Sequence, residues 1–90
     1  MNPFTVYLTP EAKRDVERLD PSILSRVLDK LEWIGRNADL IDHHQLKGLQ
    51  WGNSFRYRLG DYRIIYQMNH HERQVTILKI AHRREIYRSE

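Results

Sequence analysis

The sequence contains no cysteine and no long apolar segment, and both absences narrow the class of protein. Without cysteine, neither a disulfide framework nor a thiolate metal site can form, and this composition fits the cytoplasm. No apolar run approaches the roughly 20 residues that span a bilayer, and the first residues lack the pattern of a signal peptide. We therefore expect a cytoplasmic protein that has no membrane partner.

The chain has 90 residues, of which 40% are hydrophobic and 30% charged. This length holds one hydrophobic core but not two, and no internal repeat or linker is visible. We expect a single domain over residues 1–90.

Positive charge is concentrated in the second half of the chain. Residues 1–45 hold 6 Lys and Arg against 8 Asp and Glu, whereas residues 46–90 hold 9 against 4. Seven of those nine cations are arginine, whose planar guanidinium binds phosphate through two parallel hydrogen bonds. The cluster predicts a polyanionic partner, and the alternative is a solvated basic surface.

The first half predicts one strand and two helices. Residues 4–8 alternate and are rich in β-formers, which is typical of a strand. Thr9-Pro10 and Asp20-Pro21 each combine a capping residue with proline at the first helical position. The two helices are expected to form a hairpin.

The second helix is expected to end at Gly35 or Asn37. Residues 39–53 show no period and predict a loop. Its histidine pair His43-His44, like the later pair at 70–71, is interpreted as solvated rather than metal-binding, because adjacent histidines point in different directions. The apolar stripe of this helix consists of Leu24, Val27, Leu28, Leu31 and Ile34.

From residue 54 the hydrophobic period changes to two, which predicts three strands at 54–59, 62–68 and 74–81. Gly60-Asp61 suits a two-residue type II′ turn between the first two of them. We expect an α+β fold of order β-α-α-β-β-β, with a helical hairpin on one face of a mostly antiparallel sheet and a short C-terminal helix.

The type II′ turn sets a register in which Arg58 lies opposite Arg63. Two like charges in this position repel unless an anion binds them. A second hairpin centred on residues 71 and 72 pairs 65 with 78 and 63 with 80, which adds Leu78 and Ile80 to a partly apolar floor. The residues expected to converge over this floor are Arg56, Arg58, Arg63, His82 and Arg83, with Tyr87 folding back over them.

Such an arginine face suits RNA cleavage by the RNA's own 2′-hydroxyl. The enzyme then supplies alignment, a proton acceptor, charge stabilisation and help for the leaving oxygen, and no metal or other cofactor is required. His82 or Tyr87 is a candidate for proton transfer. The alternative is a structural cluster, in which the arginines pair with Asp61, Glu72, Glu85 or a partner's acids.

Three segments carry a resemblance to a known family. "FTVYLTPEAKRDVERLD" (4–20), "LKGLQWGNSFRYRLGDYRIIYQM" (46–68) and "VTILKIAHRREIYR" (75–88) resemble the RelE family of bacterial toxin–antitoxin modules. The resemblance implies a ribosome-dependent endoribonuclease that cuts mRNA in the ribosomal A site. It also implies a RelB-type antitoxin that neutralises the toxin, and contact with operator DNA only through the complex of the two.

The resemblance also implies residue roles. Arg56 and Arg58 correspond to basic residues that contact the phosphate, and Arg63 to the arginine that stabilises the transition state. Arg83 corresponds to the residue assigned to the leaving group or phosphate, and Tyr87 to a tyrosine that stacks on the base. The positions implied in binding RNA or the ribosome are Lys47, Arg84 and Arg88.

The chain departs from the RelE pattern in two ways. Positions 56 and 58, which can be lysine in relatives, are arginine here. A lysine ammonium can transfer a proton, whereas a guanidinium hardly ever deprotonates. The spacing from Arg83 to Tyr87 is shorter than in well-studied relatives, and His82 precedes the arginine, so His82 stays a candidate base. Two other functions stay open: a ParE-like toxin that inhibits DNA gyrase without cutting RNA, and a degenerate toxin that only binds antitoxin or represses DNA.

Overall fold

The computed structural model describes residues 3–46 and 52–88, with side chains described as far as residue 86. It confirms the expected α+β fold. The elements in chain order are β1 (Thr5–Leu8), α1 (Pro10–Glu17), α2 (Pro21–Asn37), β2 (His44–Gln45), β3 (Phe55–Leu59), β4 (Tyr62–Asn69), β5 (Gln74–His82) and α3 (Arg83–Arg88).

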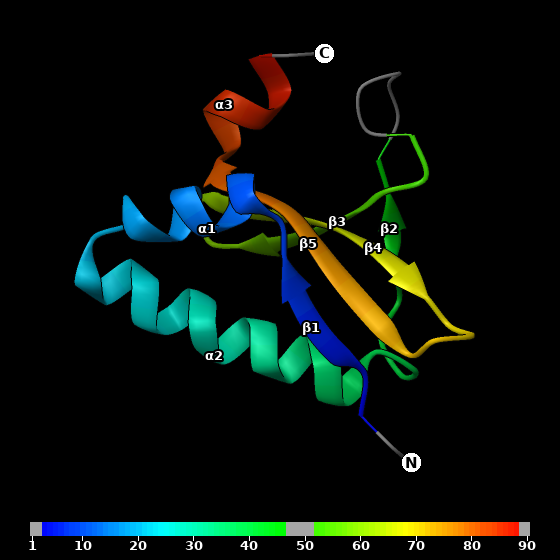
Figure 1. The fold of residues 1–90 in the computed structure, drawn as a ribbon. Helices are drawn as coiled ribbons and strands as arrows, with labels where there is room; N and C mark the ends of the chain where they lie inside the picture. Colours follow the sequence, from blue (N-terminus) through cyan, green and yellow to red (C-terminus); the bar gives the residue numbers. More distant parts are fainter. Residues whose placement is uncertain (1–2, 47–51, 89–90) are drawn as a thin grey trace.

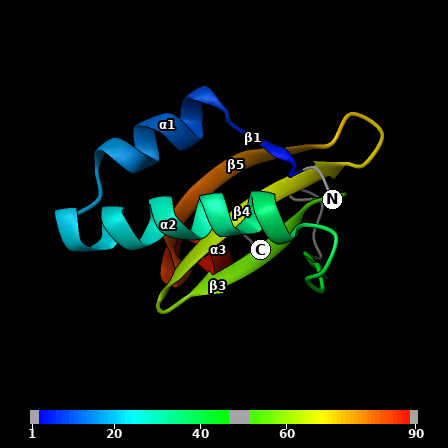
Figure 2. The same ribbon diagram turned by 90° about the horizontal axis from the view of Figure 1, so that it is seen from below.

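The strands form one sheet in the order β1-β5-β4-β3-β2. β1 is parallel to β5 and the other neighbours are antiparallel. The helices α1 and α2 cover one face, and α3 lies beyond the other face at the end of β5 (Figures 1 and 2). The short strand β2 lies in the segment expected to be a loop, and it pairs with Phe55 and Arg56 of β3. No helix in the described part of the chain is long and apolar enough to cross a membrane.

The helix starts follow the two proline signals, but the caps differ. The Thr9 hydroxyl accepts a hydrogen bond from the Ala12 amide at 3.1 Å, which confirms the first cap. The Asp20 side chain makes no such bond. α2 continues through Gly35 to Asn37, because Gly35 serves close packing rather than termination. A Cβ atom at Gly35 would lie 2.8 Å from Cγ2 of Val6.

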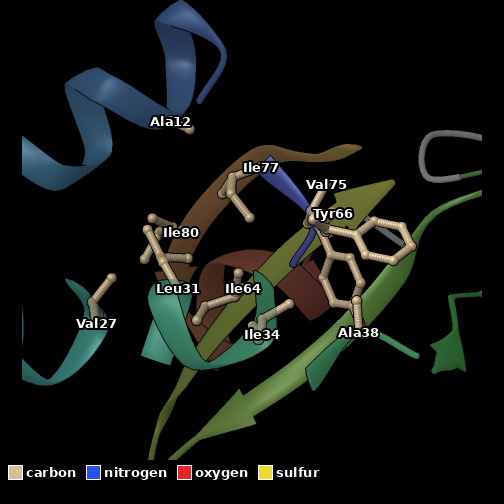
Figure 3. Close-up of a cluster of buried hydrophobic side chains, with 11 residues drawn as sticks. Ala12, Val27, Leu31, Ile34, Ala38, Ile64, Tyr66, Val75, Ile77 and Ile80 are labelled. Atoms are coloured by element: carbon tan, nitrogen blue, oxygen red, sulfur yellow. The ribbon is translucent and has the colours of Figure 1, made fainter. Parts of the chain in front are cut away.

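The main core lies between the two long helices and the sheet. Figure 3 shows Leu31 and Ile34 of α2 facing Ile64 of β4, and all three side chains are at most 5% exposed. Leu28 was expected in this stripe, but it is 48% exposed and points away from the core. The buried members of the core are Phe4, Ala12, Val27, Leu31, Ile34, Ala38, Ile64, Tyr66, Val75, Ile77 and Ile80.

The hairpin of β3 and β4 has the expected register. Arg58 lies opposite Arg63, and Tyr57 lies opposite Ile64. Gly60 has a φ angle of 59°, as the first residue of a type II′ turn requires. Two successive strands with matched alternation and a glycine turn therefore predicted this part of the sheet correctly.

The hairpin of β4 and β5 differs from the expected register because the ladder shifts between Ile65 and Tyr66. Beyond the shift, Ile65 pairs with Lys79 and Arg63 pairs with Ala81, instead of residues 78 and 80. The extra residue exchanges the faces of the following side chains. Ile80 consequently joins the core under the helices rather than the arginine face.

A second, smaller apolar cluster lies on the opposite face of the sheet. Leu46, Ile65, Ala81 and Ile86 are each at most 5% exposed, and Leu78 packs against them as expected. Ile86 belongs to α3, so this cluster fixes the C-terminal helix against the sheet. This apolar cluster is the floor beneath the basic residues of this face.

Candidate functional site

Five arginines line one hollow of about 600 Å³ on the α3 side of the sheet. Two come from β3, one from β4 and two from the start of α3. We call it the arginine hollow. Four of its members were expected to converge, and Arg84, expected to bind RNA or the ribosome, joins them. The lining residues are Arg56, Arg58, Arg63, Arg83 and Arg84.

Arg63 is the buried member of the arginine hollow, with an exposed fraction of 6%. Its Nη1 donates hydrogen bonds to the carbonyl oxygens of Gly60 and Tyr62, both at 2.9 Å. These carbonyls compensate for burying the charge, because a buried guanidinium needs oxygen partners. They also hold the guanidinium in one orientation against the hairpin.

The hydrogen bonds of Arg63 also explain why two arginines can lie opposite each other in this hairpin. Arg58, directly opposite Arg63, is exposed to solvent. One charge is thus balanced by backbone dipoles and the other by water, which lowers the repulsion expected for two exposed side chains.

Arg83 and Arg84 are positioned by the junction between β5 and α3. The Arg83 amide donates to the carbonyl of Asp61 at 2.7 Å, which ties the junction to the β3–β4 turn. The Arg83 Nε lies 3.9 Å from the Asp61 carboxylate, with the two side chains 60% and 69% exposed. Such an exposed ion pair is weak, so it leaves Arg83 available to an anionic ligand.

His82 does not lie in the arginine hollow, contrary to the expectation. The register shift pairs it with Tyr62, and their ring centroids are 5.6 Å apart. Its Nδ1 accepts a hydrogen bond from the Arg84 amide at 3.2 Å. His82 lines a separate hollow on the α1 side together with Asp15 and Arg18, and it is not among the residues that line the arginine hollow.

Three other residues named from the sequence are only partly covered by the structure. Lys47 lies outside the described residues. Tyr87 and Arg88 belong to α3, but their side chains lie outside the described part. Their assigned roles stay predictions.

Asp15 is a buried acid that the sequence analysis missed. Its Oδ2 accepts a hydrogen bond from the Ile80 amide at 2.9 Å, and its Oδ1 lies 3.6 Å from Lys79 Nζ. These contacts hold β5 just after the register shift, and they thereby help to place Arg83. The available signal was an acid between Ala12 and Val16 on the apolar face of α1.

His43 was expected to be solvated, but it is half-buried and bonded at both ring nitrogens. Nε2 lies 2.8 Å from the Ala38 carbonyl, so Nε2 carries the proton. Nδ1 lies 2.6 Å from the Tyr66 hydroxyl. Burial, and to a smaller extent Tyr57, raises the pKa of Tyr66 to about 12. Within the described residues, no group of three or more His, Asp or Glu could hold a metal ion.

The chemistry available in the arginine hollow is anion stabilisation. Guanidinium groups donate several hydrogen bonds and stay charged, so they suit a phosphate that gains negative charge during a reaction. They are unsuited to accept a proton. A proton acceptor must therefore come from outside the five lining side chains.

The chain is thus a small α+β protein whose sheet carries a basic face on the side of α3. Residues 6–87 match the sequence profile described as "ParE toxin of type II toxin-antitoxin system, parDE". The chain therefore belongs to this family of type II toxins.

Similar proteins carry RelE names. Toxin RelG of Mycobacterium tuberculosis is 32% identical over 87 residues, covering 96% of this chain and 98% of that protein. A chain of the toxin–antitoxin complex RelBE2 from M. tuberculosis superimposes with a TM-score of 0.80 at 30% identity, covering 91% of this chain and 93% of that one. The isolated Escherichia coli RelE toxin shares the fold, with a TM-score of 0.71 at 14% identity over 97% and 99% of the two chains.

Proposed function

We propose that this toxin is an endoribonuclease that cuts mRNA on the ribosome. The observation that carries the proposal is the arginine hollow, where a buried, fixed Arg63 and four further guanidiniums surround a space large enough for a phosphodiester. A cation that is already oriented before the reaction stabilises a transition state better than a flexible basic side chain does.

The proposed reaction is attack of the 2′-oxygen on the adjacent phosphorus. The new P–O2′ bond forms as the P–O5′ bond breaks, so the products carry a 2′,3′-cyclic phosphate and a 5′-hydroxyl. The 2′-hydroxyl gives its proton to a base, and the leaving O5′ gains one. Aligning the attacking oxygen with the leaving oxygen supplies part of the rate.

Each arginine has a proposed part in this reaction. Arg63 stabilises the charge that develops on the phosphorane, because its guanidinium is already oriented by the hairpin carbonyls. Arg56 and Arg58 hold the phosphate from β3. Arg83 assists the leaving oxygen from α3, where an exposed side chain can follow the substrate.

The proposed base is Tyr87, since His82 faces the other side of the sheet. Tyrosine at its ordinary pKa near 10 is a weak base, so this role requires cationic groups beside the hydroxyl. Lys47 and Arg88, with Arg84, are proposed to bind ribosomal RNA.

The proposed neutralising partner is a RelB-type antitoxin. Similar chains occur in the RelBE2 complex of M. tuberculosis and in the archaeal RelE–RelB complex from Pyrococcus horikoshii OT3, the latter at 25% identity with a TM-score of 0.73. An acidic or amphipathic segment would complement the basic half of this chain.

Brief induction of wild type, Arg63→Ala and Arg14→Ala tests the proposal. Wild type should arrest growth and produce transcripts with new 5′-hydroxyl ends inside translated regions, and Arg63→Ala should produce neither. Arg14 is an exposed arginine on α1, so Arg14→Ala should behave as wild type. Normal cleavage by Arg63→Ala would contradict the assigned site, and cleavage of an untranslated copy would contradict ribosome dependence.

Gyrase inhibition without RNA cleavage is the second candidate, and it is favoured by the ParE description of the matching family. Plasmid topology after induction separates the two functions. Loss of negative supercoiling with intact transcripts would support gyrase inhibition, whereas cut transcripts with unchanged supercoiling would support the nuclease.

A further inference from the structure

A second hollow, of about 510 Å³, adjoins the arginine hollow. Arg56 and Arg58 line both hollows, so the two lie side by side along β3. Resting on the proposed function, we infer that this second hollow binds a nucleobase of the RNA, next to the phosphate held by the arginines. Its full lining is Trp33, Ile41, Asp42, His44, Arg56, Tyr57 and Arg58.

The second hollow exists because β3 has an uncovered edge. β2 pairs with β3 only at Phe55 and Arg56, so no described strand flanks residues 57–59 on that side. Successive side chains of a strand point to opposite faces. A hollow lined by Arg56, Tyr57 and Arg58 together must therefore lie along the edge, where both faces are within reach.

The helix side of this edge is aromatic. Trp33 of α2 and Tyr57 of β3 have ring centroids 5.8 Å apart at 61°, and both rings are half-buried. Lys30 Nζ lies 4.5 Å from the Trp33 ring centroid and 5.2 Å from that of Tyr57. Partly exposed aromatic rings beside cations are the usual surface on which single-stranded RNA bases stack.

The rim of the second hollow adds polar groups that suit a base. The carboxylate of Asp42 accepts hydrogen bonds only, and it is exposed at the rim. Amino groups of adenine, cytosine and guanine can donate to it, whereas uracil offers a single imino group. This arrangement favours bases that carry an amino group.

The charge of the arginines and their position beside the aromatic rings favour RNA over a protein segment as the occupant. An RNA strand places a phosphate beside every base, and here an aromatic floor directly adjoins a row of arginines. An apolar side chain of an antitoxin would pack on the aromatic floor, but it would not place a phosphate in the adjoining arginine hollow. Protein docking is therefore kept as an outcome of the test.

Tryptophan fluorescence reports on this hollow. The chain has two tryptophans, so Trp51→Phe leaves Trp33 as the sole tryptophan, which excitation at about 295 nm selects over the tyrosines. The ligand is a 2′-O-methyl RNA hexanucleotide of mixed sequence, which cannot be cut because its 2′-oxygens are blocked. A fully abasic strand of the same length carries the same phosphates without bases and is the matched control ligand.

We expect the base-containing strand to quench Trp33 and to bind about tenfold more tightly than the abasic strand. Trp33→Leu, followed by fluorescence anisotropy of a labelled strand, should remove that difference while keeping the affinity for the abasic strand. Tyr7→Leu is the control variant, because Tyr7 is 49% exposed on β1 at the far edge of the sheet.

Equal quenching and equal affinity for both strands would overturn the inference. So would a Trp33→Leu variant that binds both strands as wild type does but loses affinity for its antitoxin, which would identify a protein-docking hollow. Failure of the proposed function is separate, because it requires that induced wild type leave transcripts uncut. Cut transcripts without base-dependent quenching would refute only the nucleobase site.

Discussion

Replacing Asp15 tests whether one buried carboxylate sets the geometry of β5. Asp15→Ala removes the acceptor of the Ile80 amide and the partner of Lys79. A buried amide without a partner costs about 1–3 kcal/mol. The ion pair adds less than a fully buried pair would, because Lys79 is 22% exposed. We expect Asp15→Ala to lower the free energy of unfolding by about 2–3 kcal/mol.

Urea denaturation followed by circular dichroism measures this change. Asp15→Asn keeps a carbonyl acceptor but loses the charge, so its loss should be smaller, about 1 kcal/mol. Glu17→Ala changes an exposed acid on the same helix and should stay within about 0.5 kcal/mol of wild type. Stability of Asp15→Ala within that same margin would refute the assignment of Asp15 as the group that holds β5 after the register shift.

Three further changes have expected outcomes. Gly35→Ala places a methyl carbon 2.8 Å from Val6. The free energy of unfolding measured by urea denaturation should therefore fall by about 1–3 kcal/mol, although alanine has the better helix propensity. The control Ser25→Ala, on the exposed face of α2, should not lower it. The pKa of Tyr66 rises from 10.0 to about 12 on folding, so wild-type stability should fall by about 1.4 kcal/mol per pH unit across that interval. Tyr66→Phe should lack this dependence. Parallel profiles of unfolding free energy against pH for the two proteins would contradict the prediction. Arg58→Ala should reduce the slope of log affinity for single-stranded RNA against log salt by about 0.7; an unchanged slope would mean that Arg58 does not contact a phosphate.

The β3–β4 hairpin could be predicted because its determinants are local. Alternation in both strands and a glycine with positive φ fix a single register, and a slip by one residue would expose the apolar set. The helix starts are similarly local, since Thr9 and the following proline lie within one turn of the first helix. Most of the arginine hollow follows from these local rules, because Arg56, Arg58 and Arg63 all belong to this hairpin.

The β4–β5 hairpin was predicted only in part, because the expected register assumed an unbroken ladder from the turn to residue 63. The shift between Ile65 and Tyr66 is accompanied by a hydrogen bond that the Ile80 amide donates to Asp15, 65 residues apart. The apolar residues of this strand change phase between Ile77 and Leu78, which is a local sign of the extra residue that the expected register did not take into account. The shift exchanges the faces of Ala81 and His82, which is why His82 was wrongly expected in the arginine hollow.

The arginine hollow combines one fixed cation with several exposed ones. Under the proposed function, the fixed and the exposed arginines have different roles. Arg63 is ordered before any ligand binds, since two carbonyls of its own hairpin hold it. A charge that is already oriented contributes to the transition state without losing side-chain entropy. Arg58 and Arg84 are exposed, so they lose that entropy on binding and contribute mainly to attracting the RNA. Substitution at 63 should therefore lower the rate constant of the bound complex, whereas substitution at 58 or 84 should weaken binding.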